Sequence, residues 1–325
     1  MKPNIAKQIN YLVKLTDKIG LIEHSSFDEP NLAEGYCVDD NARALQVCLR
    51  LKDQYPLLTN YLPVYFRFLN SAFQNDHFYN DLNADLTWQN SFEINGEHYG
   101  RTLAALGETI KFEANFSSAA KKLFDKLYSS FVNKTSSFPR VSSQIILSLR
   151  YYRSEDIKIW TDSLVAQYLK EKTDIWYWFE PRFSYDNSRM PLALLVAYQI
   201  TSDPQYLKVA LKTLDFLTKA TFDKKLGYFI FPGNNGFFGQ QPIEAGSAAE
   251  TYSLAYEITK KIKYKKLAQI AFNWYHGENI LKTSLINPKT GGIYDGLEEN
   301  GVNLNQGAES VLSYLLAYNA LENLR

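Results

Sequence analysis

Apolar residues recur with helical spacing along almost the whole chain, as in IAKQINYLVKL and AAKKLFDKLYSSFV. Alternating β-branched runs are scarce, and the best candidate for a short hairpin strand is LGYFIFPG, residues 226–233. Proline and glycine gather in a few loops, and no low-complexity linker divides the chain. The pattern therefore predicts a mainly helical protein that forms one domain over residues 1–325.

Two kinds of helix alternate in this pattern. One kind is amphipathic with a lysine-rich face, and its members are predicted over residues 5–18, 60–74, 117–132, 155–171, 204–220 and 263–281. The other kind carries little charge after its first turn and begins near residues 40, 100, 141, 188, 243 and 307. Helices that are apolar on most sides are buried, whereas helices with one charged face lie outside.

Alternating inner and outer helices predict an all-α fold, the (α/α)6 toroid, in which six helical hairpins form a closed ring. An open helical solenoid is the alternative, but its repeats are usually more uniform in length than these. The toroid is favoured because all the polar motifs occupy the same position relative to the inner helices. Each motif stands just before or within the first turn of an inner helix, so closure would bring all of them to one face.

We call these six polar segments the entrance motifs. They are GYCVDDNARAL (35–45), GEHYGRTLAALG (96–107), FPRVSS (138–143), WYWFEPRFSYDNSRMP (176–191), FFGQQPIEAGSAAE (237–250) and GVNLNQGAES (301–310). Together they supply carboxylates, amides and aromatic rings. This combination suits carbohydrate, because amides and carboxylates bond hydroxyls, rings stack on C–H faces, and paired carboxylates perform glycosidic chemistry.

Three carboxylates are predicted to be catalytic. Glu180 lies between Phe179 and Pro181, where apolar surroundings would raise its pKa and favour a general acid. Glu309 or Asp40 would be the base that activates water. We expect an inverting course, because carboxylates on opposite sides of a wide toroid would leave the roughly 6.5–9.5 Å that a water molecule needs.

A larger set is predicted to bind substrate. Trp176, Trp178 and Tyr185 would stack on sugar rings, and the arginines would hold carboxylates ionised or bind an anionic group such as phosphate or uronate. The full set is Asp39, Asn41, Arg43, His98, Arg101, Arg140, Trp176, Trp178, Tyr185, Asp186, Asn187, Arg189, Gln240, Gln241, Glu244, Asp295, Asn305 and Gln306.

Structural explanations compete with several of these roles. Asp39 and Asp40 would equally suit a helix N-cap and a first-turn acid, with Arg43 as a local ion-pair partner. Asp186 would cap a helix, and Glu244 would only complement a helix dipole. A lone histidine such as His98 is more often a structural hydrogen bonder than a proton carrier.

Composition excludes several other functions. The 35 basic and 35 acidic residues give no net field to attract nucleic acid or an anionic membrane. Cys37 and Cys48 lack CxxC spacing and no HExxH is present, so we expect two reduced thiols and neither a metal nor a cofactor. The first residues lack an export signal, and the longest apolar run, about ten residues, is too short to span a bilayer, so we expect a cytoplasmic protein.

The ordered motifs DDNARAL, EHYGRTLAALG, WYWFE…YDN, QQPIEA, DGL and GVNLNQGAES resemble those of bacterial six-hairpin-glycosidase-like proteins. These proteins are often encoded beside glycosyltransferases or mannoside phosphorylases. The resemblance runs from about residue 35 to residue 316 and implies an (α/α)6 fold, a carbohydrate-related role and a functional link to a glycosyltransferase. It supplies no catalytic pair. In the second motif an acidic pair usually precedes the glycine, and this chain keeps only Glu97.

Three functions are therefore compared. A glycoside hydrolase or phosphorylase acting on an oligosaccharide is the leading hypothesis. A sugar epimerase or isomerase would need a base such as histidine, for which only His98 lies in an entrance motif. A glycan-binding partner of a glycosyltransferase would use the same acids and rings without turnover. The sugar, its linkage and the choice between water and phosphate stay open.

Overall fold

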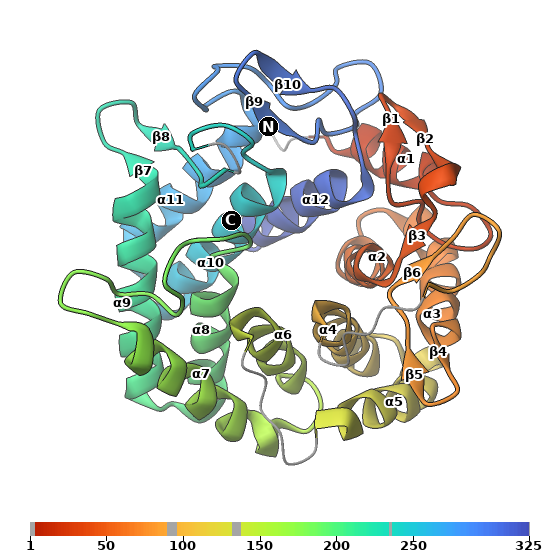
Figure 1. Cartoon of the computed structure of the whole chain (residues 1–325), viewed down its shortest axis with the longest axis horizontal. Helices are drawn as coiled ribbons and strands as arrows, with labels where there is room; N and C mark the ends of the chain where they lie inside the picture. Colours follow the sequence, from red (N-terminus) through yellow and green to blue (C-terminus); the bar gives the residue numbers. More distant parts are fainter. Residues whose placement is uncertain (1–3, 90–95, 132–137, 234–235, 325) are drawn as a thin grey trace. The chain divides into compact units, whose positions relative to one another are not determined.

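The computed structural model describes residues 4–89, 96–131, 138–233 and 236–324. Among these residues, six helices begin within three residues of the predicted inner-helix starts. The α-helices are α1 (Ala6–Lys14), α2 (Val38–Leu51), α3 (Leu62–Ser71), α4 (Glu97–Phe112), α5 (Ala114–Tyr128), α6 (Pro139–Leu149), α7 (Ile157–Glu171), α8 (Arg189–Thr201), α9 (Pro204–Thr221), α10 (Pro242–Thr259), α11 (Ile262–Asn273) and α12 (Ala308–Glu322) (Figure 1).

The strands are short and pair only as two-stranded antiparallel ribbons within the described residues. The predicted strand at residues 226–233 contains β8. The pairs are β1 (Ser25–Ser26) with β2 (Glu29–Pro30), β3 (Tyr36–Cys37) with β6 (Asp81–Leu82), β4 (Phe73–Gln74) with β5 (His77–Phe78), β7 (Phe222–Asp223) with β8 (Tyr228–Phe229), and β9 (Gly296–Glu298) with β10 (Gly301–Asn303).

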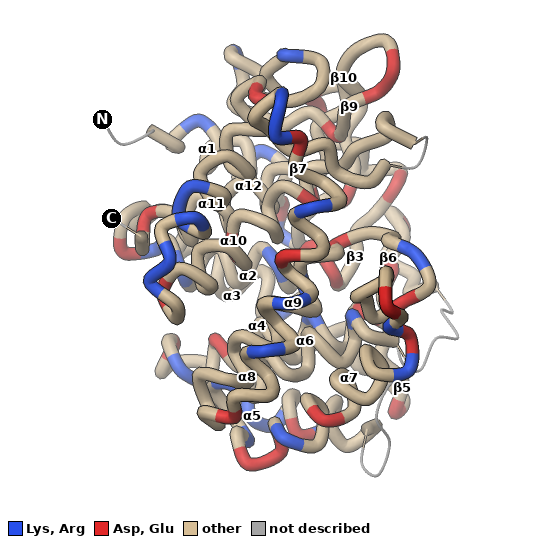
Figure 2. The backbone as a smooth tube through the Cα atoms, turned by 90° about the vertical axis from the view of Figure 1, so that its left-hand side faces the viewer, with Lys and Arg blue, Asp and Glu red and all other residues tan. Residues whose placement is uncertain are grey.

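Burial separates the two predicted kinds of helix. In α4 every residue from His98 to Thr109 is buried, whereas α5 and α11 bury one face only. Lysines recur along the outer helices α9 and α11 (Figure 2). Although the inner helices are largely apolar, no helix in the described ranges is long and apolar enough to cross a membrane.

The chain forms two compact units. Unit 1 comprises residues 1–35, 183–188 and 214–325, and unit 2 comprises residues 36–182 and 189–213. In unit 2 the inner helices α2, α4, α6 and α8 pack in sequence order, with α3, α5 and α7 each against an inner helix (Figure 1). In unit 1, α12 packs against α10, α11 and α1. That the whole chain is one domain stays a prediction.

Glycine allows the inner helices to approach closely. A Cβ atom on Gly107 of α4 would lie 2.7 Å from the backbone oxygen of Ser148 in α6. In unit 1, a Cβ on Gly246 of α10 would lie 2.9 Å from the backbone oxygen of Ser313 in α12. Backbone cannot move aside as a flexible side chain can, so these glycines set the distance between the helices.

A buried polar contact adds to this packing in unit 2. Glu108 on α4 is only 3 % exposed, and both of its carboxylate oxygens accept hydrogen bonds from α2. Gln46 Nε2 donates to Oε1 at 2.7 Å, and Arg50 Nε donates to Oε2 at 2.9 Å. A buried carboxylate is tolerated only when it is paired in this way, so Glu108 also fixes how α2 and α4 lie against each other.

The glycine contact leads to a first prediction. We expect Gly107→Ala to lower the free energy of unfolding by about 1–3 kcal/mol, because the added methyl group overpacks the α4–α6 interface. Lys111→Ala on the exposed end of the same helix is the control, with an expected change within about 0.5 kcal/mol. Urea unfolding followed by circular dichroism measures both, and equal stability of the two variants would contradict the prediction.

Candidate functional site

Among the α-helices of the described part of the chain, only inner helices carry acidic residues in the first turn. The outer helices α1, α3, α5, α7, α9 and α11 have none there. The outer helices α5 and α7 instead have an acid at the N-cap position, Glu113 and Asp156, so they differ from the inner helices in where the acid stands. The residues are Asp39 and Asp40 on α2, Glu97 on α4, Glu244 on α10 and Glu309 on α12.

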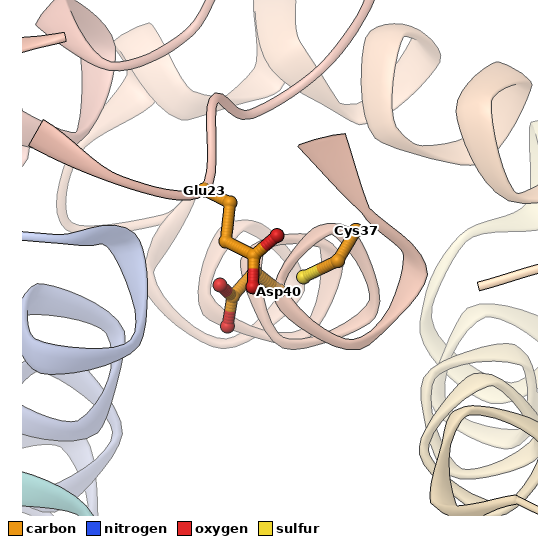
Figure 3. Close-up of side chains that lie close together, drawn as sticks. All are labelled: Glu23, Cys37 and Asp40. Atoms are coloured by element: carbon orange, nitrogen blue, oxygen red, sulfur yellow. The ribbon is translucent and has the colours of Figure 1, made fainter. Parts of the chain in front are cut away.

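The capping interpretation of Asp39 and Asp40 is wrong. The N-cap residue of α2 is Cys37, and it makes no side-chain cap hydrogen bond. Figure 3 shows the Cys37 and Asp40 side chains at the beginning of this helix. Asp39 and Asp40 instead occupy the second and third helical positions, which agrees with the other part of that interpretation, a first-turn acid.

Arg101 joins the beginnings of α2 and α4. It is 6 % exposed, and its Nη1 lies 3.0 Å from Asp39 Oδ1 while its Nη2 lies 2.7 Å from Glu97 Oε2. Burial alone would raise the pKa of Asp39, but Arg101, Arg43 and His98 outweigh it and hold this pKa below its ordinary value. Asp39 is therefore an ionised group in a fixed position.

Asp40 is bound within its own helix. Arg43 Nη1 donates to Asp40 Oδ1 at 2.7 Å, and Asp40 is only 3 % exposed. Asn41, also in the first turn, donates from Nδ2 to the backbone oxygen of Cys37 at 2.8 Å. A buried carboxylate that already accepts an arginine is poorly suited to activating water, so the structure argues against Asp40 as the base.

Glu180 does not have the apolar surroundings expected from its neighbours in sequence. Arg140, the second residue of α6, donates from Nη1 to Oε1 at 3.0 Å and from Nη2 to Oε2 at 2.7 Å. Such a bidentate pair stabilises the ionised carboxylate, whereas a general acid must carry a proton. These two hydrogen bonds stand in place of the apolar surroundings on which the prediction of Glu180 as the acid is based.

The aromatic run beside Glu180 divides into core and accessible rings. Trp178 and Phe179 are both fully buried and meet edge to face, so Trp178 has no exposed face for a sugar and its predicted stacking role is contradicted. Trp176 is half-buried and donates from Nε1 to the backbone oxygen of Glu180 at 2.7 Å. Tyr185, in unit 1, is 41 % exposed. The stacking prediction stays open for Trp176 and Tyr185.

In unit 1, Glu244 holds the short segment 183–188. Asn187 Nδ2 lies 3.2 Å from each carboxylate oxygen of Glu244, and both side chains are buried. Asp186 in the same segment is 1 % exposed and has a left-handed backbone, with φ of 45°. These contacts show that Glu244 does more than complement the α10 dipole, because it also accepts hydrogen bonds from an irregular turn.

Asp295 holds the first turn of α12. Its Oδ1 accepts the backbone N–H of Gly307 at 2.7 Å and the hydroxyl of Ser310 at 2.6 Å. Burial raises the pKa of Asp295, the two hydrogen bonds and His24 oppose this, and the charge of Glu309 adds to the rise. Since residues 307 and 310 flank Glu309, Asp295 fixes the turn that carries it.

Two predicted amides also belong to the framework. Gln240 is fully buried, and its Oε1 accepts from the backbone of Phe231 and from Trp274 Nε1. Gln306 is 1 % exposed, and its Oε1 accepts from the Thr290 hydroxyl at 3.1 Å. Both side-chain oxygens therefore satisfy protein groups, and the predicted contact of these residues with substrate stays a prediction.

Three other predicted binding residues keep that role as a prediction. Gln241 is exposed at the N-cap of α10, and Arg189 is the half-buried first residue of α8. Asn305 is exposed, although its Oδ1 accepts the backbone N–H of Phe27 at 3.0 Å. None of these placements excludes a contact with substrate.

His98 occupies a structural position. Its Nε2 lies 3.2 Å from the backbone oxygen of Phe78, its ring stacks on the Phe78 ring, and it is 5 % exposed. This arrangement favours the structural interpretation over a proton-transfer role. Cys37 and Cys48 are both buried and unbridged, which confirms the predicted free thiols. Burial raises the pKa of the Cys48 thiol.

Asp81 joins this region, although no entrance motif contains it. It lies on β6 directly opposite Cys37 of β3, and α2 begins at the residue after Cys37. Burial raises the pKa of Asp81, the charge of Asp39 raises it further, and a hydrogen bond from Asn80 opposes both. Only the pairing of two strands 44 residues apart places it here, and no sequence period signals that pairing.

Several solved structures share this fold. D-mannose isomerase matches with a TM-score of 0.78 and 10% identity over 98% of this chain and 96% of its own. Cellobiose 2-epimerase from Bacillus thermoamylovorans B4167 matches with 0.76 and 14% over 98% and 97%. An inactive variant of the α-1,6-mannanase GH76A of Salegentibacter sp. HEL1_6, in complex with α-1,6-mannotetrose, matches with 0.69 and 14% over 99% and 98%.

No family profile and no curated protein matches this sequence. The structural similarities nevertheless span nearly the whole chain, and its helices alternate between inner and outer as predicted. The chain therefore has the all-α (α/α)6 toroid fold.

The Asp39–Arg101 pair leads to a second prediction. A carboxylate whose folded-state pKa is depressed adds stability that is present above its unfolded pKa, about 3.9, and lost as the pH falls through its folded value. We expect Asp39→Asn to cost about 1–3 kcal/mol at pH 7, and we expect this cost to shrink steadily as the pH falls below about 3.9. Urea unfolding across this range tests the expectation, with the exposed Asp53→Asn as control. A cost independent of pH would refute it.

Proposed function

We propose that this protein is a carbohydrate-active enzyme, and specifically a glycoside hydrolase that cleaves an oligosaccharide with inversion. The observation that carries the proposal is that, among the described α-helices, only inner helices carry first-turn acids. Fixed carboxylates accept hydrogen bonds from sugar hydroxyls and perform the acid and base steps of glycosidic cleavage.

Glu309 is the residue we assign as the base. It lies in the first turn of α12 and is only part-buried, so water can reach it. Asp295 holds the residues on either side of it through Gly307 and Ser310. A base fixed in this way needs no reorganisation when it takes a proton from water.

We assign Glu180 the role of orienting the substrate. The bidentate pair with Arg140 fixes the orientation of its carboxylate, and carboxylate oxygens accept hydrogen bonds from sugar hydroxyls. The Trp176 indole, fixed to the backbone oxygen of Glu180, lies in the same loop and suits stacking on a sugar face. Hydrogen bonding beside stacking is the usual basis of sugar recognition in such sites.

The arginines favour a neutral substrate and water as the acceptor. Arg43, Arg101 and Arg140 each bind a carboxylate. A phosphate or uronate would have to displace these internal partners, whereas a neutral sugar and water would not. Hydrolysis is therefore proposed in preference to phosphorolysis.

The comparisons support a carbohydrate substrate, since the names of the three similar structures concern mannose, cellobiose and a mannan. Two of them are an isomerase and an epimerase, and this favours sugar epimerisation as the second candidate function. His98 is not free to act as its base, because Nε2 faces Phe78. His24, which is half-exposed and whose charge acts on Asp295, would be the better candidate.

Proton NMR of the protein with manno-, gluco- and galacto-oligosaccharides, with and without phosphate, tests the proposal. We expect release of a smaller sugar, no dependence on phosphate, and an inverted anomer at the earliest time point. Conversion of a reducing-end sugar without cleavage would establish the epimerase instead. Line broadening without any product would establish a glycan-binding protein and would direct attention to the glycosyltransferase that it serves.

The base assignment gives a third prediction. We expect Glu309→Gln to lower kcat by about 10²–10⁴-fold while the dissociation constant for the oligosaccharide changes little, because the amide keeps its shape but cannot take a proton. Glu299→Gln in an exposed turn is the matched control. Steady-state kinetics and NMR titration give the two quantities, and an unchanged kcat would remove Glu309 from the mechanism.

A further inference from the structure

The proposed hydrolysis needs a protonated group that none of the predicted catalytic residues provides. Asp40 and Glu180 are both held by arginines, and Glu309 is assigned as the base. We propose that Asp81 is the proton donor, with Asp39 as its ionised neighbour. This inference rests on the proposed function, since a proton donor is meaningful only if the bond is cleaved.

Backbone hydrogen bonds fix Asp81 beside the first turn of α2. In the β3–β6 ribbon, Asp81 is the direct partner of Cys37, the N-cap residue of α2. The N–H of Val38 donates to the backbone oxygen of Asn80 at 2.8 Å, and Asp39 follows Val38 in the chain. Asp81 therefore lies beside the same helix beginning as Asp39, although the two are 42 residues apart in sequence.

The two carboxylates have opposite electrostatic surroundings. Asp39 lies against Arg101, with Arg43 and His98 also favouring its charge. Asp81 has no basic partner in the described ranges, and it is half-buried beside the negative Asp39. Burial first and then Asp39 raise the pKa of Asp81, whereas the pKa of Asp39 is lowered, so Asp81 binds a proton more readily than Asp39 does. Two neighbouring carboxyl groups whose pKa values are shifted in opposite directions are typical of an acid and its ionised partner.

An unsatisfied acceptor beside Asp81 points to a ligand. Asn80 donates from Nδ2 to Asp81 Oδ1 at 2.8 Å, which fixes the orientation of the carboxyl group. The other end of the same amide, Asn80 Oδ1, is buried and has no hydrogen-bond partner in the part of the chain that the structure describes. Such an atom costs free energy unless a donor reaches it, and a sugar hydroxyl supplies that donor.

The step balances as a single proton transfer. The Asp81 carboxyl gives its proton to the glycosidic oxygen while the bond from this oxygen to the anomeric carbon breaks, and the bonding electron pair leaves with the oxygen. Water adds to the anomeric carbon and loses a proton to the base. Asp81 is left ionised and regains a proton from solvent, and the base loses its proton to solvent, so the cycle closes.

Leaving-group dependence separates a proton donor from a binding residue. We expect Asp81→Asn to lower kcat/KM about 10²–10⁴-fold on the oligosaccharide that the wild-type protein cleaves. On the 4-nitrophenyl glycoside of the same sugar we expect less than about a tenfold loss, because nitrophenolate leaves without protonation. Glu180→Gln is the contrast, since an orienting group affects both substrates equally. Asp76→Asn, in the exposed β4–β5 turn, is the matched control.

A carboxyl-carbon NMR titration tests the same idea without relying on a variant that folds. In the wild-type protein we expect the Asp81 midpoint to lie above the ordinary value of about 3.9, and in Asp39→Asn we expect it to move to lower pH as the neighbouring charge is lost. The pH profile for cleavage of the oligosaccharide should change in the same way. Its alkaline limb should lie at lower pH in Asp39→Asn than in the wild-type protein, because this limb reports loss of the donor proton.

The outcomes separate the two proposals. If the wild-type protein cleaves no glycoside, the proposed function fails. If it does cleave and Asp81→Asn is unchanged, or is equally slow on both substrates, only the assignment of Asp81 is overturned. A wild-type Asp81 midpoint below about 3.9 would overturn it as well.

Discussion

The close approach of the inner helices is the constraint on which the rest of the structure depends. At Gly107 and Gly246 the space for a side chain is taken by the backbone of the neighbouring inner helix. Helices this close leave no room for side chains of ordinary size between them. Most buried charged residues of the inner helices lie near the helix beginnings, and the buried Glu108, bonded to Gln46 and Arg50, is an exception satisfied from the neighbouring helix.

At those beginnings the main problem is how to keep carboxylates charged in a partly buried place. Arg101 shares its guanidinium between Asp39 and Glu97, and Arg140 meets both oxygens of Glu180. Burying an ion without a partner costs several kcal/mol, so each pairing is required for the fold as well as for the site. Asp81 is different because it has an amide and a negative neighbour in place of a cation.

The fold was largely predictable, because helical periodicity and the contrast between apolar and lysine-bearing helices are local features of the sequence. For the candidate site, the sequence predicts which helix beginnings carry acids but not how those acids are paired. Burial of Trp178, the ion pair of Glu180 with Arg140, and the partners of Gln240 are set by segments far apart in the chain. Asp81 shows the same limit, because it reaches α2 through a two-residue strand that no periodicity reveals.

The burial of these ion pairs has a consequence for how the protein responds to its medium. Dissolved ions screen exposed charges within about 8–10 Å at ordinary salt concentrations, but they screen buried pairs far less. Arg101 and Arg140 are each only 6 % exposed. The arrangement of carboxylates at the helix beginnings is therefore insulated from ionic strength, and concentrated salt would disturb the exposed lysine faces of the outer helices long before it reached this network.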